Sequence, residues 1–73
     1  MDIGNRALKR LGKRIQKIRR DKGWSQETFA LEVELARSYI SGVERGQRNL
    51  SFKAVARIAH ALGVSISEMC EDV

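Results

Sequence analysis

The 73-residue sequence contains no proline, one cysteine and one histidine, and none of its apolar runs is long enough to span a bilayer. Without proline, the breaks between segments fall at glycine and capping residues, which favours helices joined by short turns. Cys70 has no second cysteine with which to form an internal disulfide, and this fits a reducing cytosol. The N-terminus lacks the apolar segment of a signal peptide. We therefore expect a cytoplasmic protein that does not enter a membrane.

Residue types that commonly carry catalysis or bind metal are equally scarce. His60 has no cysteine, aspartate or glutamate at a spacing that would share a metal, and we expect it on the surface. Cys70 has no base near it in the sequence, which is typical of a structural thiol. The sequence has no glycine-rich phosphate loop, zinc-ligand spacing or nucleophile motif. We predict that the protein is not an enzyme and that it has no cofactor, no metal and no small-molecule ligand.

Positive charge, in contrast, is abundant and unevenly placed. The chain holds 14 lysine and arginine residues against 9 acidic ones, a formal charge of +5, and nine of the basic residues lie between Arg6 and Lys22. Such asymmetry predicts one face for a polyanion, although a long surface helix solvated by its basic side chains is the alternative. A chain of this length forms one domain, here residues 1–73. It buries only roughly 60% of its unfolded surface, so oligomerisation is a reasonable source of stability.

Apolar residues recur with the period of a helix along most of the chain. We expect five helices: one over residues 5–22, one from after Ser25 to near Val33, one over residues 36–45, one from after Ser51 to Gly63, and a short one from Ser65. The fourth helix is expected to bury Phe52, Val55, Ile58, Ala59 and Leu62, and to turn Lys53 and Arg57 to solvent. Since no segment alternates as a strand does, the predicted fold class is all-α.

The segment QETFALEVELARSYISGVER, Gln26 to Arg45, is the most informative part of the chain. It is typical of two short helices joined by a tight turn, a helix-turn-helix unit. Ala30 must be small because the second helix of the unit crosses close over it. Ile40 and Val43 lie one turn apart and anchor that helix to the core, which leaves its opposite side to a partner. In a basic chain without a catalytic constellation, we predict that this partner is the DNA major groove.

The outward side of this second helix and the loop after it supply the candidate DNA contacts. Arg37 is able to donate two hydrogen bonds to a guanine, which contributes roughly 1–3 kcal/mol of discrimination. The predicted base-reading residues are Ala36, Arg37, Ser38, Ser41 and Gly42. The predicted contacts to the DNA backbone, which fix register without reading sequence, are Gln26, Tyr39, Arg45, Gln47, Arg48 and Asn49. Alternative interpretations are an ordinary polar surface, a capping role for Asn49, and no role for Gly42.

Three strings carry a resemblance to a known family: IQKIRRDKGWSQETFA, RSYISGVERGQRNLS and IAHALGVSISEM. Over about Leu11 to Met69 the chain resembles the helix-turn-helix regulators that include lambdoid phage repressors, Cro and the xenobiotic-response-element type. The resemblance implies a compact, five-helix, lambda-repressor-like domain. It also implies that Gln26 contacts phosphate and that the start of the third helix reads bases, with Gly42 at a reading position that has no side chain. A buried ion pair of Arg19 with Glu44 is implied as well, and Arg19 at the margin of the first apolar stripe needs such a partner.

Within that family, RSYISGVERGQRNLS looks most like the controller proteins of restriction–modification systems. This implies DNA contacts by Arg37, Ser38 and Tyr39, and a grip on the backbone by Arg48. The chain departs from the family pattern at the turn, where Glu34 replaces the usual glycine, and at Ala36, which replaces the usual capping residue. Glu34 is therefore expected either to accept strain at a positive φ or to change the turn geometry.

The sequence thus predicts a sequence-specific, homodimeric transcriptional regulator that binds a pseudo-palindromic double-stranded operator. Two copies related by a two-fold axis would place half-sites about one helical turn, roughly 34 Å, apart. The predicted dimer surface consists of Ile66, Met69 and Val73, with packing onto their own core as the alternative. Other functions that fit the same string are a phage-type repressor, an antitoxin and an adaptor that binds proteins rather than DNA.

Overall fold

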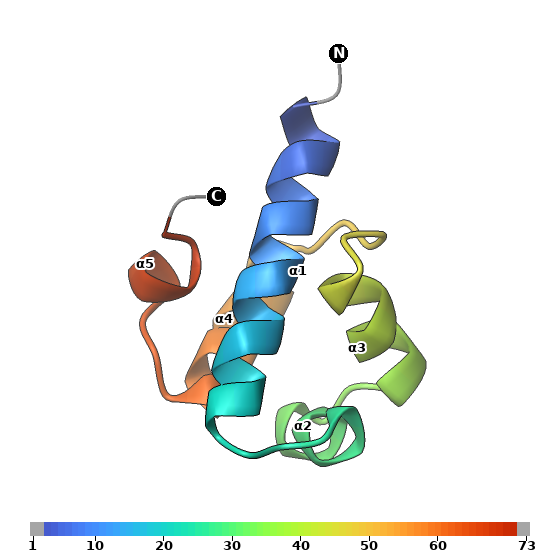
Figure 1. The fold of residues 1–73 in the computed structure, drawn as a ribbon, viewed down its shortest axis with the longest axis vertical. Helices are drawn as coiled ribbons and strands as arrows, with labels where there is room; N and C mark the ends of the chain where they lie inside the picture. The colour runs from blue at the N-terminus through green and yellow to red at the C-terminus, as the bar shows by residue number, and fades with distance from the viewer. Residues whose placement is uncertain (1–2, 72–73) are drawn as a thin grey trace.

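The structure is a computed structural model that describes residues 3–71, and within them it contains helices and no strand. The helices are α1 (Ile3–Asp21), α2 (Gln26–Val33), α3 (Arg37–Glu44), α4 (Phe52–Leu62) and α5 (Ile66–Met69). Figure 1 shows α1 crossing in front of α4, with α2 and α3 on one side and the short α5 on the other. The predicted all-α fold class is confirmed. None of the helices in this part of the chain combines the length and apolarity that a membrane span requires.

One core lies where these helices meet. Its fully buried side chains come from every helix, and the largest of them are Phe29, Ile15, Ile40, Ile58, Met69 and Val43. Helices α2, α4 and α5 begin where a serine caps them, since the hydroxyls of Ser25, Ser51 and Ser65 each accept a hydrogen bond from the backbone N–H three residues later. Glu68 completes a capping box with Ser65 at the start of α5. Local capping therefore accounts for where three of the helices begin, and one shared apolar core holds the described helices together.

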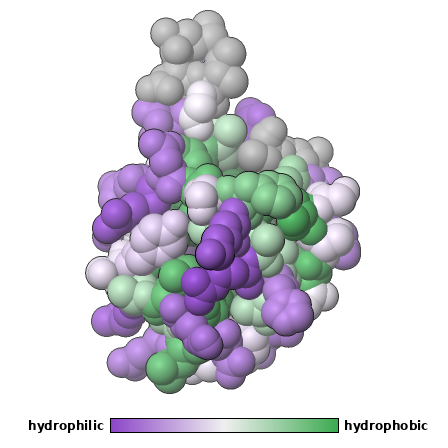
Figure 2. Space-filling model, turned by 180° about the vertical axis from the view of Figure 1, so that it is seen from behind, coloured by the Kyte–Doolittle hydropathy of each residue, from purple (hydrophilic) through white to green (hydrophobic). Residues whose placement is uncertain are grey.

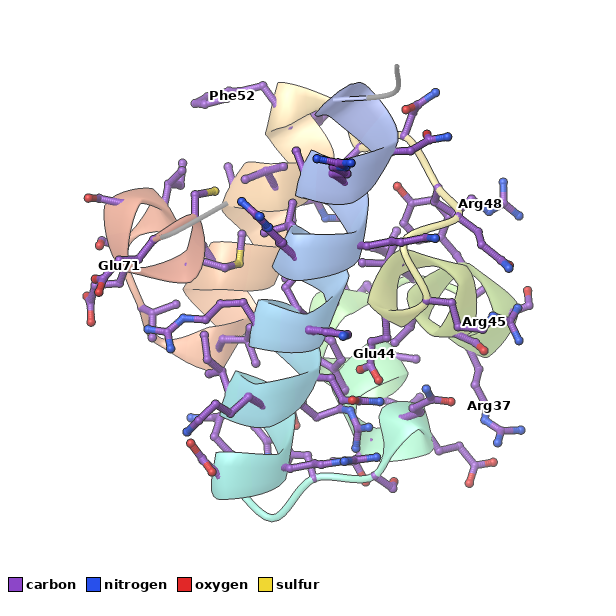
Figure 3. The ribbon with its side chains drawn as sticks, turned by 45° about the horizontal axis from the view of Figure 1, so that its top comes forward. Arg37, Glu44, Arg45, Arg48, Phe52 and Glu71 are labelled. Atoms are coloured by element: carbon purple, nitrogen blue, oxygen red, sulfur yellow. The ribbon has the colours of Figure 1, made fainter. Side chains whose placement is uncertain are left out.

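The first turn of α4 differs from the expectation. Phe52 was predicted to be buried, but 75% of its surface is exposed and Figure 3 shows its ring projecting outward. Phe52 lies seven residues before Ala59 and therefore on nearly the same side of the helix. The other helices cover this side only from Val55 onward, where burial increases toward Ile58 and Ala59. The apolar stripe of α4 thus extends past the end of the core.

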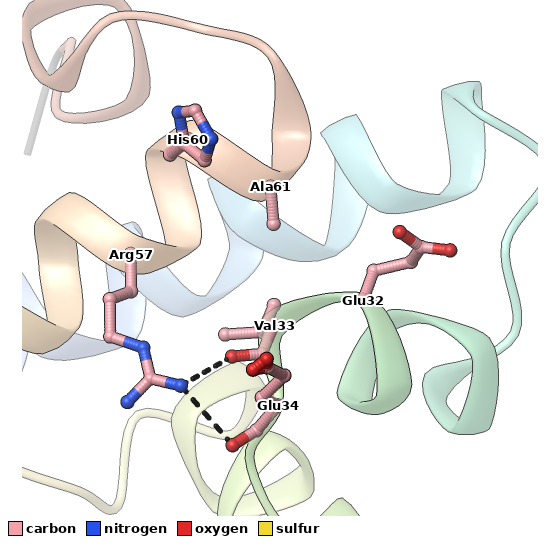
Figure 4. Close-up of a pocket in the computed structure, with 6 residues that line it drawn as sticks. All are labelled: Glu32, Val33, Glu34, Arg57, His60 and Ala61. Atoms are coloured by element: carbon pink, nitrogen blue, oxygen red, sulfur yellow. Dashed lines mark hydrogen bonds between the residues drawn. The ribbon is translucent and has the colours of Figure 1, made fainter.

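The turn between α2 and α3 is built on a residue with a left-handed backbone. Glu34 has φ 62° and ψ 43°, so the strained alternative proposed for this position is the one that the chain adopts. The N–H groups of Glu34 and Leu35 donate to the carbonyls of Leu31 and Ala30, at 3.2 and 3.0 Å, and close the end of α2. Arg57 is exposed, as expected. Its Nη2 also donates to the carbonyl oxygens of Val33 and Glu34, at 2.8 and 3.3 Å (Figure 4).

Helix α1 approaches the end of α3 so closely that glycine is required on both sides of the contact. A Cβ atom on Gly12 would lie 2.4 Å from the carbonyl oxygen of Val43 and 2.7 Å from that of Glu44. A Cβ atom on Gly46 would lie 2.6 Å from the Cα of Lys9. Sequence reasoning missed this contact, although a glycine in the middle of a long amphipathic helix, at a cost of about 1 kcal/mol relative to alanine, was a signal for it. The contact sets the position of α3 against α1.

Candidate nucleic-acid interface

Helix α3 presents one apolar and one polar side. Ile40 and Val43 are 0% and 2% exposed and face the core, whereas Ala36, Arg37 and Ser38 are exposed at its N-terminal end. Ala36, the residue before the helix, has an extended backbone and makes no side-chain capping bond. The geometry therefore leaves the start of α3 open to an external partner.

Three arginines lie around this polar side. Figure 3 shows Arg37, Arg45 and Arg48 projecting on the side of the molecule that carries α3, from its first residue to the loop that follows it. All three are exposed, as are Gln47 and Asn49 of the same loop. Because arginine pairs two parallel N–H donors with phosphates and with guanine edges, this clustering suits a nucleic acid.

A buried ion pair holds α3 to the rest of the domain. Arg19 donates from Nε to Oε2 of Glu44 at 2.6 Å and from Nη2 to Oε1 at 3.0 Å, so the pair expected between these residues is formed. The side chains are 8% and 1% exposed. A further bond runs from Nη1 of Arg19 to the carbonyl oxygen of Trp24 at 2.7 Å. The charges are therefore paired and hydrogen-bonded, as burial requires.

Two glutamines extend this network. Gln26, the first residue of α2, donates from Nε2 to Oε1 of Glu44 at 3.1 Å, and Gln16 of α1 donates to the same oxygen at 3.4 Å. Glu44 is the last residue of α3, and its carboxylate accepts hydrogen bonds from side chains of α1 and α2. It therefore ties the end of α3 to both helices. Gln26 is only half-buried, so bracing Glu44 leaves part of its side chain accessible.

Gly42 differs from the expectation of a base-reading position. It is buried, and a Cβ atom there would lie 2.9 Å from Cγ of Arg48. The side chain of Arg48 therefore lies across α3 at this point and covers the glycine. The guanidinium carbon of Arg48 lies 5.3 Å from the centre of the Tyr39 ring, at cation–π distance. Tyr39 and Ser41, at the edges of α3, are half-buried.

The family model described as Helix-turn-helix matches residues 15–69, which include all of α2, α3, α4 and α5. The chain belongs to the helix-turn-helix family. It is 38% identical over 65 residues to Control protein C.MunI of a Mycoplasma species, and the match covers 88% of each protein.

Two solved structures show the same likeness in three dimensions. The restriction–modification controller protein C.AhdI from Aeromonas hydrophila matches with a TM-score of 0.82 and 45% identity, covering 85% of this chain and 94% of that one. The controller protein C.Esp1396I, solved as a tetramer in complex with its natural 35-base-pair operator, matches with a TM-score of 0.80 and 42% identity over 88% of each chain. The resemblance to helix-turn-helix regulators, and to controller proteins among them, is confirmed.

The surface predicted to join two copies of this helix-turn-helix chain needs correction. Met69 is 0% exposed and belongs to the monomer's own core, because α5 turns it inward between α4 and α1. Ile66 is half-buried against that core, and Val73 lies outside the described residues. The exposed apolar side chain in this region is instead Phe52, which sequence reasoning had assigned to the core.

Metal-binding groups and pockets outside α3 were the other candidates for a functional site. Among residues 3–71, no group of three histidine, cysteine, aspartate or glutamate residues is placed to hold a metal ion. A shallow hollow lies between the end of α2 and α4 (Figure 4), and its lining residues are Glu32, Val33, Glu34, Arg57, His60 and Ala61. Arg57 is engaged there by two backbone carbonyls, so the guanidinium supports the turn.

Proposed function

We propose that this chain is a sequence-specific DNA-binding transcriptional regulator, with the role of a restriction–modification controller protein. The observation that carries the proposal is the polar side of α3, which is exposed and flanked by Arg37, Arg45 and Arg48 while its opposite side is locked into the core. A helix held this way fits the major groove of B-DNA, and its N-terminal residues meet base edges. The function is binding rather than catalysis, and we place it in the cytoplasm.

The candidate residues divide into those that meet base edges and those that contact phosphates. Arg37 reads a guanine through paired N–H donors, and Ser38 and Ser41 reach a neighbouring base edge or phosphate. Ala36 offers only its methyl group and backbone, which suits apolar contact with a thymine. The remaining polar residues contact phosphates and set the register of α3, and they are Gln26, Tyr39, Arg45, Gln47, Arg48 and Asn49.

Self-association follows from a second surface. Figure 3 shows Phe52 projecting on the side of α4 where α5 lies, and Figure 2 shows apolar side chains gathered toward α5 on the face behind α1. We assign this surface, Phe52 with Ile66, to a second copy of the chain, because the related C.Esp1396I forms a tetramer on its operator. A two-fold contact there gives a homodimer with two copies of α3 for a pseudo-palindromic site.

The reading role of Arg37 is tested by measuring sequence preference. DNA fragments selected by the purified wild type supply a cognate duplex, and affinity is then compared with a random duplex at several salt concentrations. Arg37→Ala should lose roughly 1–3 kcal/mol of preference for the cognate duplex. Arg20→Ala, which removes an equal charge from an exposed residue at the end of α1, should leave the preference intact. A wild type that binds both duplexes equally would refute the proposal and favour the adaptor or antitoxin.

The dimer surface is tested by sedimentation. Phe52→Ser should shift the protein toward monomer with its helical content intact, since the exposed ring contributes little to the monomer core. Leu31→Ser is the matched control, because Leu31 is 78% exposed on α2 and lies among acidic residues. Equal effects of the two substitutions on self-association would contradict the assignment.

A further inference from the structure

The side chain of Arg48 folds back across α3. It leaves the loop after the helix, yet an added Cβ atom on Gly42 would lie 2.9 Å from its Cγ, 3.4 Å from its Nε and 3.7 Å from its Cδ. Its guanidinium carbon lies over the Tyr39 ring, 5.3 Å from the ring centre. Tyr39 and Gly42 are three residues apart in α3 and therefore neighbours on its surface. Together they form a seat for Arg48, with the ring at one end and the bare glycine backbone at the other.

The backbone of the loop brings Arg48 to this seat. The N–H of Gln47 donates to the carbonyl oxygen of Gly42 at 2.9 Å, so the chain turns back along α3 as soon as the helix ends. Gly46 allows that reversal with φ +74°. Arg48 follows directly, and its Cγ occupies the space in which any side chain at position 42 would begin. The absence of a side chain at Gly42 therefore leaves open the space in which Arg48 lies.

A seated arginine differs chemically from a free one. A contact between the guanidinium and the Tyr39 ring restricts the rotamers of the long side chain before a ligand arrives, so less freedom is lost on binding. The planar guanidinium carries its N–H donors around its edge, where they are able to bind a phosphate while the group packs on an aromatic ring. Arg48 is exposed beside the polar side of α3, next to Arg45.

We propose that Gly42 is a positioning residue for DNA binding, and that it acts by seating Arg48 against Tyr39 with the guanidinium held ready for a backbone phosphate. This inference rests on the proposed function, since it assigns a mechanism to one of its phosphate contacts. Gly42 itself contributes no contact to a base. It contributes by leaving open the space that the side chain of Arg48 occupies.

The effects of substitutions at Gly42 and Arg48 on DNA affinity should not be additive. Arg48→Ala should weaken binding about tenfold, for cognate and random duplexes alike, and should reduce the salt dependence by about one unit of slope per protomer. Gly42→Ala should weaken binding roughly threefold to tenfold with the same indifference to sequence, because the new methyl group displaces Arg48. The double variant should bind no more weakly than Arg48→Ala alone, because the seat has no occupant left to position.

Affinities are measured by fluorescence anisotropy over a salt series, with two readouts that do not need DNA. Far-ultraviolet circular dichroism checks that each variant is folded, and alanine in place of a mid-helix glycine should preserve helical content. Proton NMR of the free protein should show the δ-methylene protons of Arg48 shifted by the Tyr39 ring in the wild type, and that shift should disappear in Gly42→Ala. Gly4→Ala is the matched control, because nothing lies within 4 Å of a Cβ atom there and both readouts should stay unchanged.

Each failure points to a different error. An unchanged affinity in folded Gly42→Ala, or an equal loss caused by this substitution with and without Arg48, would overturn the inference while leaving DNA binding intact. A wild type that binds no DNA would overturn the proposed function, even with the ring-induced shift present. Should Gly42→Ala fail to fold, Tyr39→Leu removes the other end of the seat, and Tyr39→Phe, which keeps the ring, measures the contact made by the Tyr39 hydroxyl alone. The part of the Tyr39→Leu loss that exceeds the Tyr39→Phe loss should likewise vanish in the Arg48→Ala background.

Discussion

Replacing Glu44 with alanine removes the carboxylate on which α1, α2 and α3 converge. Arg19, whose side chain is only 8% exposed, would keep its charge and lose both bonds to Glu44, at 2.6 and 3.0 Å. Breaking one side of a buried, hydrogen-bonded ion pair typically costs about 3–5 kcal/mol, because the remaining charge is uncompensated. A domain of this length has a total free energy of unfolding of roughly 4–11 kcal/mol. Glu44→Ala should therefore remove a large share of the stability and lower Tm by about 12–40 °C.

Urea denaturation followed by circular dichroism measures this loss, and the chain contains its own control. Lys17 and Asp21 form an ion pair of 3.0 Å in which both side chains are 65% exposed. Asp21→Ala should cost no more than about 0.5 kcal/mol, since water screens an exposed i, i+4 pair. A loss in Glu44→Ala that is no larger than the loss in Asp21→Ala would refute the reasoning from burial.

A double variant separates the net contribution of the Arg19–Glu44 pair to stability from the cost of leaving one of its charges unpaired. Replacing Arg19 with methionine and Glu44 with leucine in the same chain removes both charges and keeps the volume apolar. Substitutions of this kind are often neutral or stabilising, because two desolvation costs disappear together. We expect the double variant to be more stable than Glu44→Ala by at least about 2 kcal/mol.

Two further substitutions test the backbone around α3. Glu34→Gly should raise the free energy of unfolding by about 0.5–1 kcal/mol in thermal melts, because glycine adopts the left-handed conformation at φ 62° without strain; a lower Tm would show that the side chain makes a contact that outweighs this strain. Gly12→Ala should cost about 2 kcal/mol or more in urea titrations, because its Cβ would lie 2.4 Å from the carbonyl oxygen of Val43, while Gly4→Ala in the same helix should be neutral or slightly stabilising. Equal stabilities of these two alanine variants would contradict the close approach of α1 to α3.

Features that depend on neighbouring residues in the sequence were predictable. Ser25 and Ser65 start helices because their hydroxyls bond to backbone N–H groups only three residues away. The inward direction of Ile40 and Val43 follows from the period of the helix. Arg19 was recognisable as a residue in need of a partner, because it lies at the edge of an apolar stripe where an unpaired charge is costly.

Features that depend on packing between segments far apart in the sequence were not predictable from the helical period. The helical period assigns Phe52 to the apolar side of α4, but only the packed structure shows that the core stops before it. Met69 lies near the terminus, where apolar residues suggest an interface, yet α5 folds back and buries it. Arg57 finds its acceptors on the carbonyls of a turn more than 20 residues earlier in the chain. No local pattern encodes such a partnership.

The seat of Arg48 combines both kinds of information. That Gly42 is unfavourable within a helix is readable from the sequence, and so is the presence of an arginine in the following loop. The direction in which the loop leaves α3 depends on the bond between Gln47 and Gly42 and on the backbone of Gly46. Sequence reasoning therefore predicted the residues of the candidate interface and missed the contact of Arg48 with Gly42 and Tyr39.

The glycine contact between α1 and α3 has a consequence for how such a domain varies. At Gly12 the two helices meet main chain against main chain, with no layer of side chains between them. A contact made of side chains shifts when those side chains are exchanged, whereas peptide groups are the same in every variant. Repacking around Phe29 or Ile58 thus alters how firmly the domain holds together, while the tilt of α3 stays tied to α1. The orientation of the exposed side of α3 is therefore expected to be preserved when core residues are substituted.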